Sequence, residues 1–117
     1  MADYKSIKNW ADDDKPREKL AQHGRQALSN AELLAILIGS GTRNKSAVDL
    51  ARELLALANN DINVLARFNI KDLCQVNGIG PAKAITLIAA IEIASRRDFK
   101  KTEEVIIRSS ADAYNVL

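Results

Sequence analysis

The segment 73–84 constrains the fold of this chain more than any other part of the sequence. At its centre is a Gly-hydrophobic-Gly turn, Gly78-Ile79-Gly80, with apolar residues before it and Pro81 directly after it. Glycines allow backbone conformations that other residues rarely adopt, and proline is favoured in the first turn of a helix. The segment therefore predicts two helices joined by a tight turn, which is the helix-hairpin-helix pattern.

Helix signals also occur along the rest of the chain. Ser29 and Glu32 have the spacing of a capping box, in which each side chain accepts a hydrogen bond from the other residue's backbone N–H. Asn and Asp residues suited to helix caps precede two short apolar segments further along. The expected helices cover residues 16–23, 29–38, 47–57, 62–67, 70–76 and 81–97. The sequence thus predicts an all-α, compact bundle of five to six short helices.

The distribution of charged and apolar residues divides the chain into three parts. Residues 1–14 end in an acidic run without helical periodicity and are expected to form an N-terminal arm. Residues 15–98 hold the helical domain. Within it, the segment 81–97 is apolar nearly all round, so we expect it to form the central, buried helix. The segment 99–117 is expected to be a linker and the start of a missing C-terminal domain.

The composition excludes several classes of protein. One cysteine and one histidine cannot form an internal disulfide or a zinc site with several Cys or His ligands. No apolar stretch is long enough to span a bilayer, and no signal peptide begins the chain, so we expect a cytoplasmic protein with no membrane contact. Because no catalytic constellation is present, we expect a binding module that is not an enzyme and needs no cofactor or metal.

The residue types in the hairpin turn suit an anion. Backbone N–H groups after the glycines point outward at the N-terminus of the next helix, where the helix dipole favours negative charge. Ile79 is expected to point into the core, and Lys83 to supply a cation one turn along on an exposed face. Gly78, Ile79, Gly80 and Lys83 are therefore candidate DNA-phosphate contacts. Contacts to phosphate carry no sequence information, so we expect binding that is independent of base sequence.

A second and less regular turn lies upstream at Gly39-Ser40-Gly41. A polar residue stands where the downstream turn has an apolar one, and the loop is two residues longer. Arg43 and Lys45, rather than backbone amides, would then contact phosphate. Two interpretations stay open: Gly39, Gly41, Arg43 and Lys45 form a second DNA-binding hairpin in pseudo-symmetric tandem with the first, or the segment is a solvated connection between helices.

Four segments, in this order and spacing, resemble the N-terminal domain of the bacterial RadC proteins. They are Pro16-Arg17-Glu18-Lys19-Leu20, Leu28-Ser29-Asn30-Ala31-Glu32-Leu33-Leu34-Ala35, the stretch from Gly39 to Lys45-Ser46-Ala47, and Gly78-Ile79-Gly80-Pro81-Ala82-Lys83-Ala84. In that family the helical domain precedes a zinc-dependent JAMM (MPN-type) domain with a His-x-His and Asp metal site. This chain has no His-x-His, so no hydrolase residue is carried over. The resemblance implies a C-terminal JAMM-type domain in the full-length protein and a role in DNA repair or recombination.

The sequence as a whole favours sequence-independent binding of duplex or branched DNA through the phosphate backbone. The alternative is a protein-interaction or scaffolding helical domain whose hairpin does not bind DNA. A formal net charge of only +2 favours that alternative, because DNA-binding domains are usually more basic. The preferred DNA structure and the oligomeric state stay open at this point.

Overall fold

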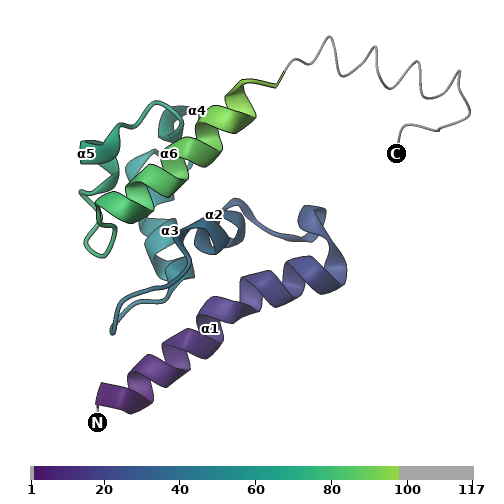
Figure 1. Cartoon of the computed structure of the whole chain (residues 1–117), viewed down its shortest axis with the longest axis vertical. Helices are drawn as coiled ribbons and strands as arrows, with labels where there is room; N and C mark the ends of the chain where they lie inside the picture. The colour runs from purple at the N-terminus through teal and green to yellow at the C-terminus, as the bar shows by residue number, and fades with distance from the viewer. Residues whose placement is uncertain (1, 98–117) are drawn as a thin grey trace, which may run out of the picture.

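A computed structural model describes residues 2–97 of the chain, with side chains from residue 12 onward. Within this range six α-helices and one short 3-10 helix form, and no strand does. The elements are α1 (Ala2–His23), the 3-10 helix η1 (Arg25–Ala27), α2 (Asn30–Ile38), α3 (Ala47–Leu57), α4 (Ile62–Leu65), α5 (Ile70–Leu73) and α6 (Pro81–Ser95) (Figure 1). The predicted all-α fold is confirmed. Segment 99–117, the expected linker, lies outside the described residues.

The core is centred on α2 and α3, which pack against each other between α1 on one side and α6 on the other (Figure 1). Leu50 and Leu54 on α3 are fully buried, as is Leu73 at the end of α5. Leu50 and Leu54 stand one helical turn apart on α3, so they share one apolar face, and Leu73 from α5 belongs to the same core cluster. The middle layer therefore carries the hydrophobic core, and the outer helices pack on it by one face each.

The helix α6 is not the central one. Only Ala84 and Leu87 of its residues are buried, whereas Ile85 is 54% exposed and Ile93 is 73% exposed. The prediction that the segment 81–97 is central and buried is therefore wrong. An apolar helix can be surrounded by other helices or can leave one apolar face uncovered, and its composition alone does not distinguish the two cases. In the part of the chain that the structure describes, α6 contacts α2 and α5 along its inner face only.

The N-terminal helix begins earlier than the sequence pattern predicts. Pro16 lies inside α1, although a proline in a helix interior removes a backbone hydrogen bond and costs about 3 kcal/mol. Both Pro16 and Asp13, one turn earlier, are buried where α1 contacts α2 and α3, and this packing offsets the cost. The predicted helix start at Pro16 is therefore wrong, and the expected arm 1–14 is helical over its described residues. The predicted end before Gly24 is confirmed.

Side-chain caps start the four helices in the middle of the chain. Ser29 accepts from the Glu32 amide at 3.2 Å while Glu32 accepts from the Ser29 amide at 2.9 Å, which confirms the predicted capping box. Reciprocal boxes also form at α3 between Ser46 and Asp49 and at α5 between Asn69 and Asp72, and Asp61 caps α4. Each cap satisfies backbone N–H groups that a helix N-terminus leaves without a partner.

The carboxylate of Glu32 also joins α2 to α1. Lys19 Nζ lies 3.2 Å from both Glu32 oxygens. The pKa of Glu32 is held below its ordinary value, first by the hydrogen bond from the Ser29 backbone amide and then by Lys19. A carboxyl with a lowered pKa in the folded state adds stability above its ordinary pKa of about 4.3, and that stability is lost as the pH falls through the folded value.

We therefore expect Glu32→Gln to flatten the acid dependence of stability. The parent should lose free energy of unfolding more steeply than the variant between about pH 5 and about pH 3, because only the parent has this carboxyl to protonate. Urea unfolding at a series of pH values measures the difference. Glu18→Gln, at an exposed position on α1, is the control and should follow the parent. Parallel curves for Glu32→Gln and the parent would contradict the expectation.

None of the helices in residues 2–97 combines the length and the apolar character that crossing a membrane requires.

Candidate nucleic-acid interface

The two glycines of the turn between α5 and α6 differ in what they require. Gly78 has φ +110°, in the left-handed region, and a Cβ there would lie 2.8 Å from Thr42 Cγ2 and 2.9 Å from Leu50 Cδ2. Gly80 has φ −89°, which any residue adopts, and a Cβ there would meet no described atom within 4 Å. We expected both glycines to adopt a backbone conformation that other residues rarely adopt, and this expectation holds for Gly78 alone. Gly78 permits close packing, whereas Gly80 leaves an open approach.

Ile79 lies between them and points inward. Its side chain is 3% exposed and belongs to the cluster that includes Leu73 and Val76, the apolar residues before the turn. Its backbone N–H donates to the Val76 carbonyl at 3.0 Å. The apolar residue thus fixes the turn against the core, as the sequence pattern predicts, and Gly80 after it is exposed.

The N-terminus of α6 differs from those of α2 to α5. No side chain caps it among the described residues; Gly80 occupies the N-cap position and Pro81 the first turn. Pro81 has no N–H, and the Ala84 amide bonds to the Gly80 carbonyl at 3.0 Å. The amides of Ala82 and Lys83 are therefore the donors that a capping oxygen would take. They lie at the positive end of a helix of 15 residues, next to the open side of Gly80.

Lys83 connects the two turns. Its Nζ donates to the Ser40 carbonyl in the α2–α3 loop at 2.6 Å, and its side chain is half-buried. The expectation of a freely exposed Lys83 is corrected accordingly. An ammonium group has three N–H donors, so this contact leaves donors for another acceptor. Together with the approach of Gly78 to Thr42, it brings the two turns side by side at one end of the molecule.

The comparisons with known proteins agree on one family. The family model described as "UPF0758 N-terminal" matches residues 7–85. The chain belongs to the UPF0758 family. It is 47% identical over 116 residues to a UPF0758 protein of Flavobacterium johnsoniae, and the matched region covers 96% of this chain and 49% of that protein. It is 43% identical over 115 residues to a UPF0758 protein of Alkaliphilus oremlandii, and here the matched region covers 97% of this chain and 50% of that protein.

A UPF0758 protein of Staphylococcus aureus is 49% identical over 90 residues, covering 77% of this chain and 39% of that protein. The chain thus spans about half the length of the Flavobacterium johnsoniae and Alkaliphilus oremlandii proteins. No solved structure matches it.

In this UPF0758 domain the upstream turn is filled by a carboxylate from α1. Asp13, 4% exposed, accepts from the Gly41 amide at 2.8 Å and from the Ala47 amide at 2.6 Å. Ala47 is the first residue of α3, so this carboxylate also lies at the positive end of that helix. Gly41 has no open side, because a Cβ there would collide with the Lys45 carbonyl.

Gly39, the C-cap of α2, has φ +87°, and its carbonyl accepts from Arg17 at 3.4 Å. The upstream loop therefore holds an internal anion where the downstream turn is open. Asp13 is not among the residues predicted from the sequence, because it lies in an acidic run, Asp12-Asp13-Asp14, in which nothing local distinguishes one carboxylate from the others. The one available signal is its spacing of one turn from Pro16.

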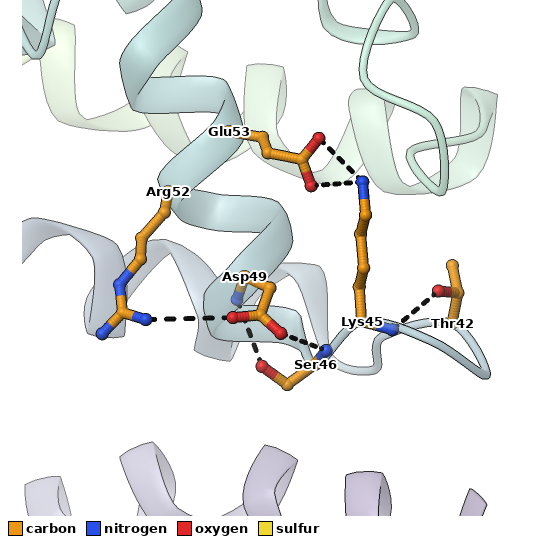
Figure 2. Close-up of polar contacts among 6 residues, drawn as sticks. All are labelled: Thr42, Lys45, Ser46, Asp49, Arg52 and Glu53. Carbon is orange, nitrogen blue, oxygen red and sulfur yellow. Dashed lines mark hydrogen bonds and ion pairs between the residues drawn. The ribbon is translucent and has the colours of Figure 1, made fainter. Parts of the chain in front are cut away.

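The cations of the upstream loop also have partners within the chain. Lys45 Nζ lies 2.9 and 2.8 Å from the two oxygens of Glu53 on α3, and Figure 2 shows the lysine side chain reaching up from the loop to that carboxylate. The Lys45 amide donates to the Thr42 hydroxyl at 3.2 Å, which closes the loop on itself. Arg43 is exposed at the loop. The structure thus brings Lys83, Gly78 and this loop together, while the charge of Lys45 is balanced by Glu53.

Proposed function

We propose that this domain binds DNA through its phosphate backbone at the turn between α5 and α6, without reading base sequence. The observation that carries the proposal is the uncapped, open N-terminus of α6. Four other helices have a capping side-chain oxygen at their N-cap position, whereas at α6 a glycine without steric neighbours exposes the Ala82 and Lys83 amides. A phosphate oxygen is an acceptor that can take the place of that missing cap.

The electrostatics favour a weak interaction. A helix N-terminus contributes roughly half an elementary charge, and Lys83 adds one more beside it. The overall charge of +2 adds little long-range attraction. We therefore expect a dissociation constant on the order of 10 to 100 μM at physiological salt, in the range of nonspecific binding.

The upstream turn has a different role in this proposal. The Gly41 amide already donates to Asp13, so Gly39 and Gly41 serve to shape the loop that lies against the downstream turn. Arg43 and Lys45 stay candidate phosphate contacts through their side chains, with Lys45 first having to leave Glu53. The two turns would then resemble each other in backbone shape, but only the turn before α6 would offer backbone amide donors to phosphate.

We also propose a role for the full-length protein, of which this domain would form one part. The resemblance of this chain to the N-terminal domain of bacterial RadC proteins supports a cytoplasmic role in DNA repair or recombination. It also supports a C-terminal JAMM-type domain as the partner in the full-length protein. In that arrangement the module described here is not itself an enzyme and needs no cofactor; it would bring the second domain to DNA.

Titration of fluorescently labelled DNA tests the proposal. Two duplexes of unrelated sequence should bind with the same affinity, and branched and single-stranded DNA at low and moderate salt establish the preferred structure. Lys83→Ala should weaken binding to both duplexes equally and make the slope of log K against log salt shallower by about one. It should lower the free energy of unfolding by about 1 kcal/mol, because the bond to the Ser40 carbonyl is lost as well.

Arg25→Ala is the matched control. Arg25 is an exposed cation in η1, which lies at the opposite end of the molecule from the α5–α6 turn (Figure 1). Removing it deletes the same charge away from the hairpin, so the salt slope should stay that of the parent. Equal slopes for the parent, Lys83→Ala and Arg25→Ala would remove the support for a phosphate site at this turn.

A protein-interaction module is the second candidate. The observation in its favour is the outer face of α6, where Ile85 and Ile93 are more than half exposed. Two large apolar side chains exposed on one helix face could form part of a surface that another protein covers. Absence of DNA binding at low salt, with the fold intact, would make this the leading function.

A further inference from the structure

The outward face of α6 has a spacing that fits a copy of itself. Its exposed residues Ala82, Ile85, Thr86, Ala89 and Ile93 follow helical periodicity and form one stripe opposite the buried Ala84 and Leu87. Ile85 and Ile93 stand four residues before and four residues after Ala89. Within this stripe Ile85, Ala89 and Ile93 are symmetric about Ala89, with a small side chain at the centre and a large one on either side, whereas the positions symmetric to Ala82 and Thr86 are Arg96 and Glu92.

We propose that two copies of this chain pair through α6, antiparallel, about a two-fold axis that passes by Ala89. In such a pair Ile85 of each copy packs against Ile93 of the other, and Ala89 faces its own counterpart. A two-fold interface uses the same patch on both copies, so it requires a self-complementary arrangement of this kind. Alanine at the crossing point lets the helix axes approach to about 8 Å, the short end of the range for packed helices.

The polar groups on this face are compatible with the pairing. The Thr86 hydroxyl donates to the Ala82 carbonyl of its own helix at 3.1 Å, so its donor has a partner without help from a second copy. Glu92 at the rim is paired with Arg96 at 2.9 Å. The same symmetry places Thr86 of one copy opposite Glu92 of the other and Ala82 opposite Arg96, so no two like charges face each other. The two helix dipoles run in opposite directions, which is favourable.

The size of the stripe sets the strength of the pair. A helix of 15 residues is about 22 Å long, so one helix face covers much less than the roughly 800 Å² per partner of a standard stable interface. The dimer is therefore weak. We expect its fraction to rise between about 10 μM and about 1 mM chain, which corresponds to roughly 4 to 7 kcal/mol of binding free energy.

Disulfide trapping tests the geometry with the full chain in a Cys74→Ala background. Ala89→Cys should oxidise to a covalent dimer, because Cα atoms on two helices 8 Å apart come within the approximately 4.4 to 6.8 Å that a disulfide spans. Ile85→Cys and Ile93→Cys should each crosslink at least tenfold more slowly alone, yet crosslink rapidly when the two variants are mixed. Ala82→Cys, exposed on the same face, is the control for random collision and should be slow.

Sedimentation equilibrium supplies the second measurement. The parent should show an average mass that increases with concentration, and Ala89→Glu should remain a monomer with an unchanged melting temperature, because Ala89 is exposed in the single chain. Constant monomer mass of the parent up to about 1 mM would overturn the pairing and leave this face to a different partner. Equal crosslinking rates for Ala82→Cys and Ala89→Cys would overturn the two-fold axis at Ala89.

Discussion

Gly80→Asp should weaken DNA binding strongly and leave the fold at least as stable as that of the parent chain. Gly80 has φ −89° and ψ 178°, the extended conformation usual for N-cap residues, and its Cβ position is open. An aspartate there can accept from the Ala82 and Lys83 amides and interact favourably with the helix dipole. Capping by Asp and the dipole together add from a few tenths to about 1 kcal/mol of stability.

The same carboxylate occupies the proposed phosphate position with a negative charge. Affinity for duplex DNA should fall at least about tenfold, which corresponds to 1.4 kcal/mol. A variant that is more stable and binds less cannot be explained by unfolding, so this substitution separates the role in binding from the role in the fold. Fluorescence titration at low salt, together with thermal unfolding of the same samples, measures both quantities.

Three further substitutions in the turn serve as controls. Gly80→Asn offers the Ala82 and Lys83 amides a neutral oxygen as acceptor, and this variant should lose less affinity for DNA than Gly80→Asp. Gly80→Ala adds one methyl group at the approach and should have the smallest effect of the three on binding. Gly78→Ala should reduce stability instead, because a side chain at φ +110° is strained and its Cβ would press on Thr42 and Leu50.

If Gly80→Asp binds DNA as the parent does, with the same salt slope, the uncapped helix end is not a phosphate site. The turn would then be a structural connection, and the protein-interaction function would replace DNA binding.

Local chemistry explains which parts of this fold could be predicted from the sequence. The starts of α2, α3 and α5 depend on residues three apart in the chain, such as Ser29 and Glu32, so each capping pattern is visible in a short window. The stop at Gly24 and the tight turn at Gly78 are also local, because both depend on a left-handed backbone conformation. These features do not need knowledge of the tertiary structure.

Features that depend on tertiary packing could not be predicted in this way. Pro16 favours a helix start by its own chemistry, and only burial of α1 against α2 and α3 makes it an interior residue. The composition of α6 shows that the helix is apolar, but not which of its faces is covered. The contacts of Asp13 with Gly41 and Ala47 span 28 and 34 residues, so no local pattern contains both partners.

The same reasoning applies to the candidate site. The left-handed Gly78 and the inward Ile79 were predicted because the turn motif is contiguous. The contact of Lys83 with the Ser40 carbonyl, 43 residues away, could not be predicted from a local pattern. This contact changes Lys83 from an exposed cation into one that also links the two turns. The difference between an open and an occupied turn likewise depends on Asp13, which comes from a distant helix.

Asp13→Ala should cost about 3 kcal/mol of folding free energy, because it leaves two amide donors without their acceptor. Hydrogen bonds to a charged group contribute about 1.5 to 3 kcal/mol each, and both the Gly41 and the Ala47 amides bond to this carboxylate. The substitution also removes a negative charge from the N-terminus of α3, where the dipole favours it. The loss should appear as a large decrease in the urea midpoint, with the slope of the transition unchanged.

Two variants establish that the two hydrogen bonds, and not the local charge of α1, are the cause. Asp13→Asn keeps one carbonyl oxygen as an acceptor and should lose about half as much stability, since its NH₂ group then faces the other amide donor. Asp14→Ala removes a carboxylate next along the same helix, but that side chain is 65% exposed and pairs with the exposed Arg17 at 3.5 Å. Its cost should stay within about 0.5 kcal/mol. If Asp13→Ala were no more destabilising than Asp14→Ala, the carboxylate would not be what holds the α2–α3 loop to α1.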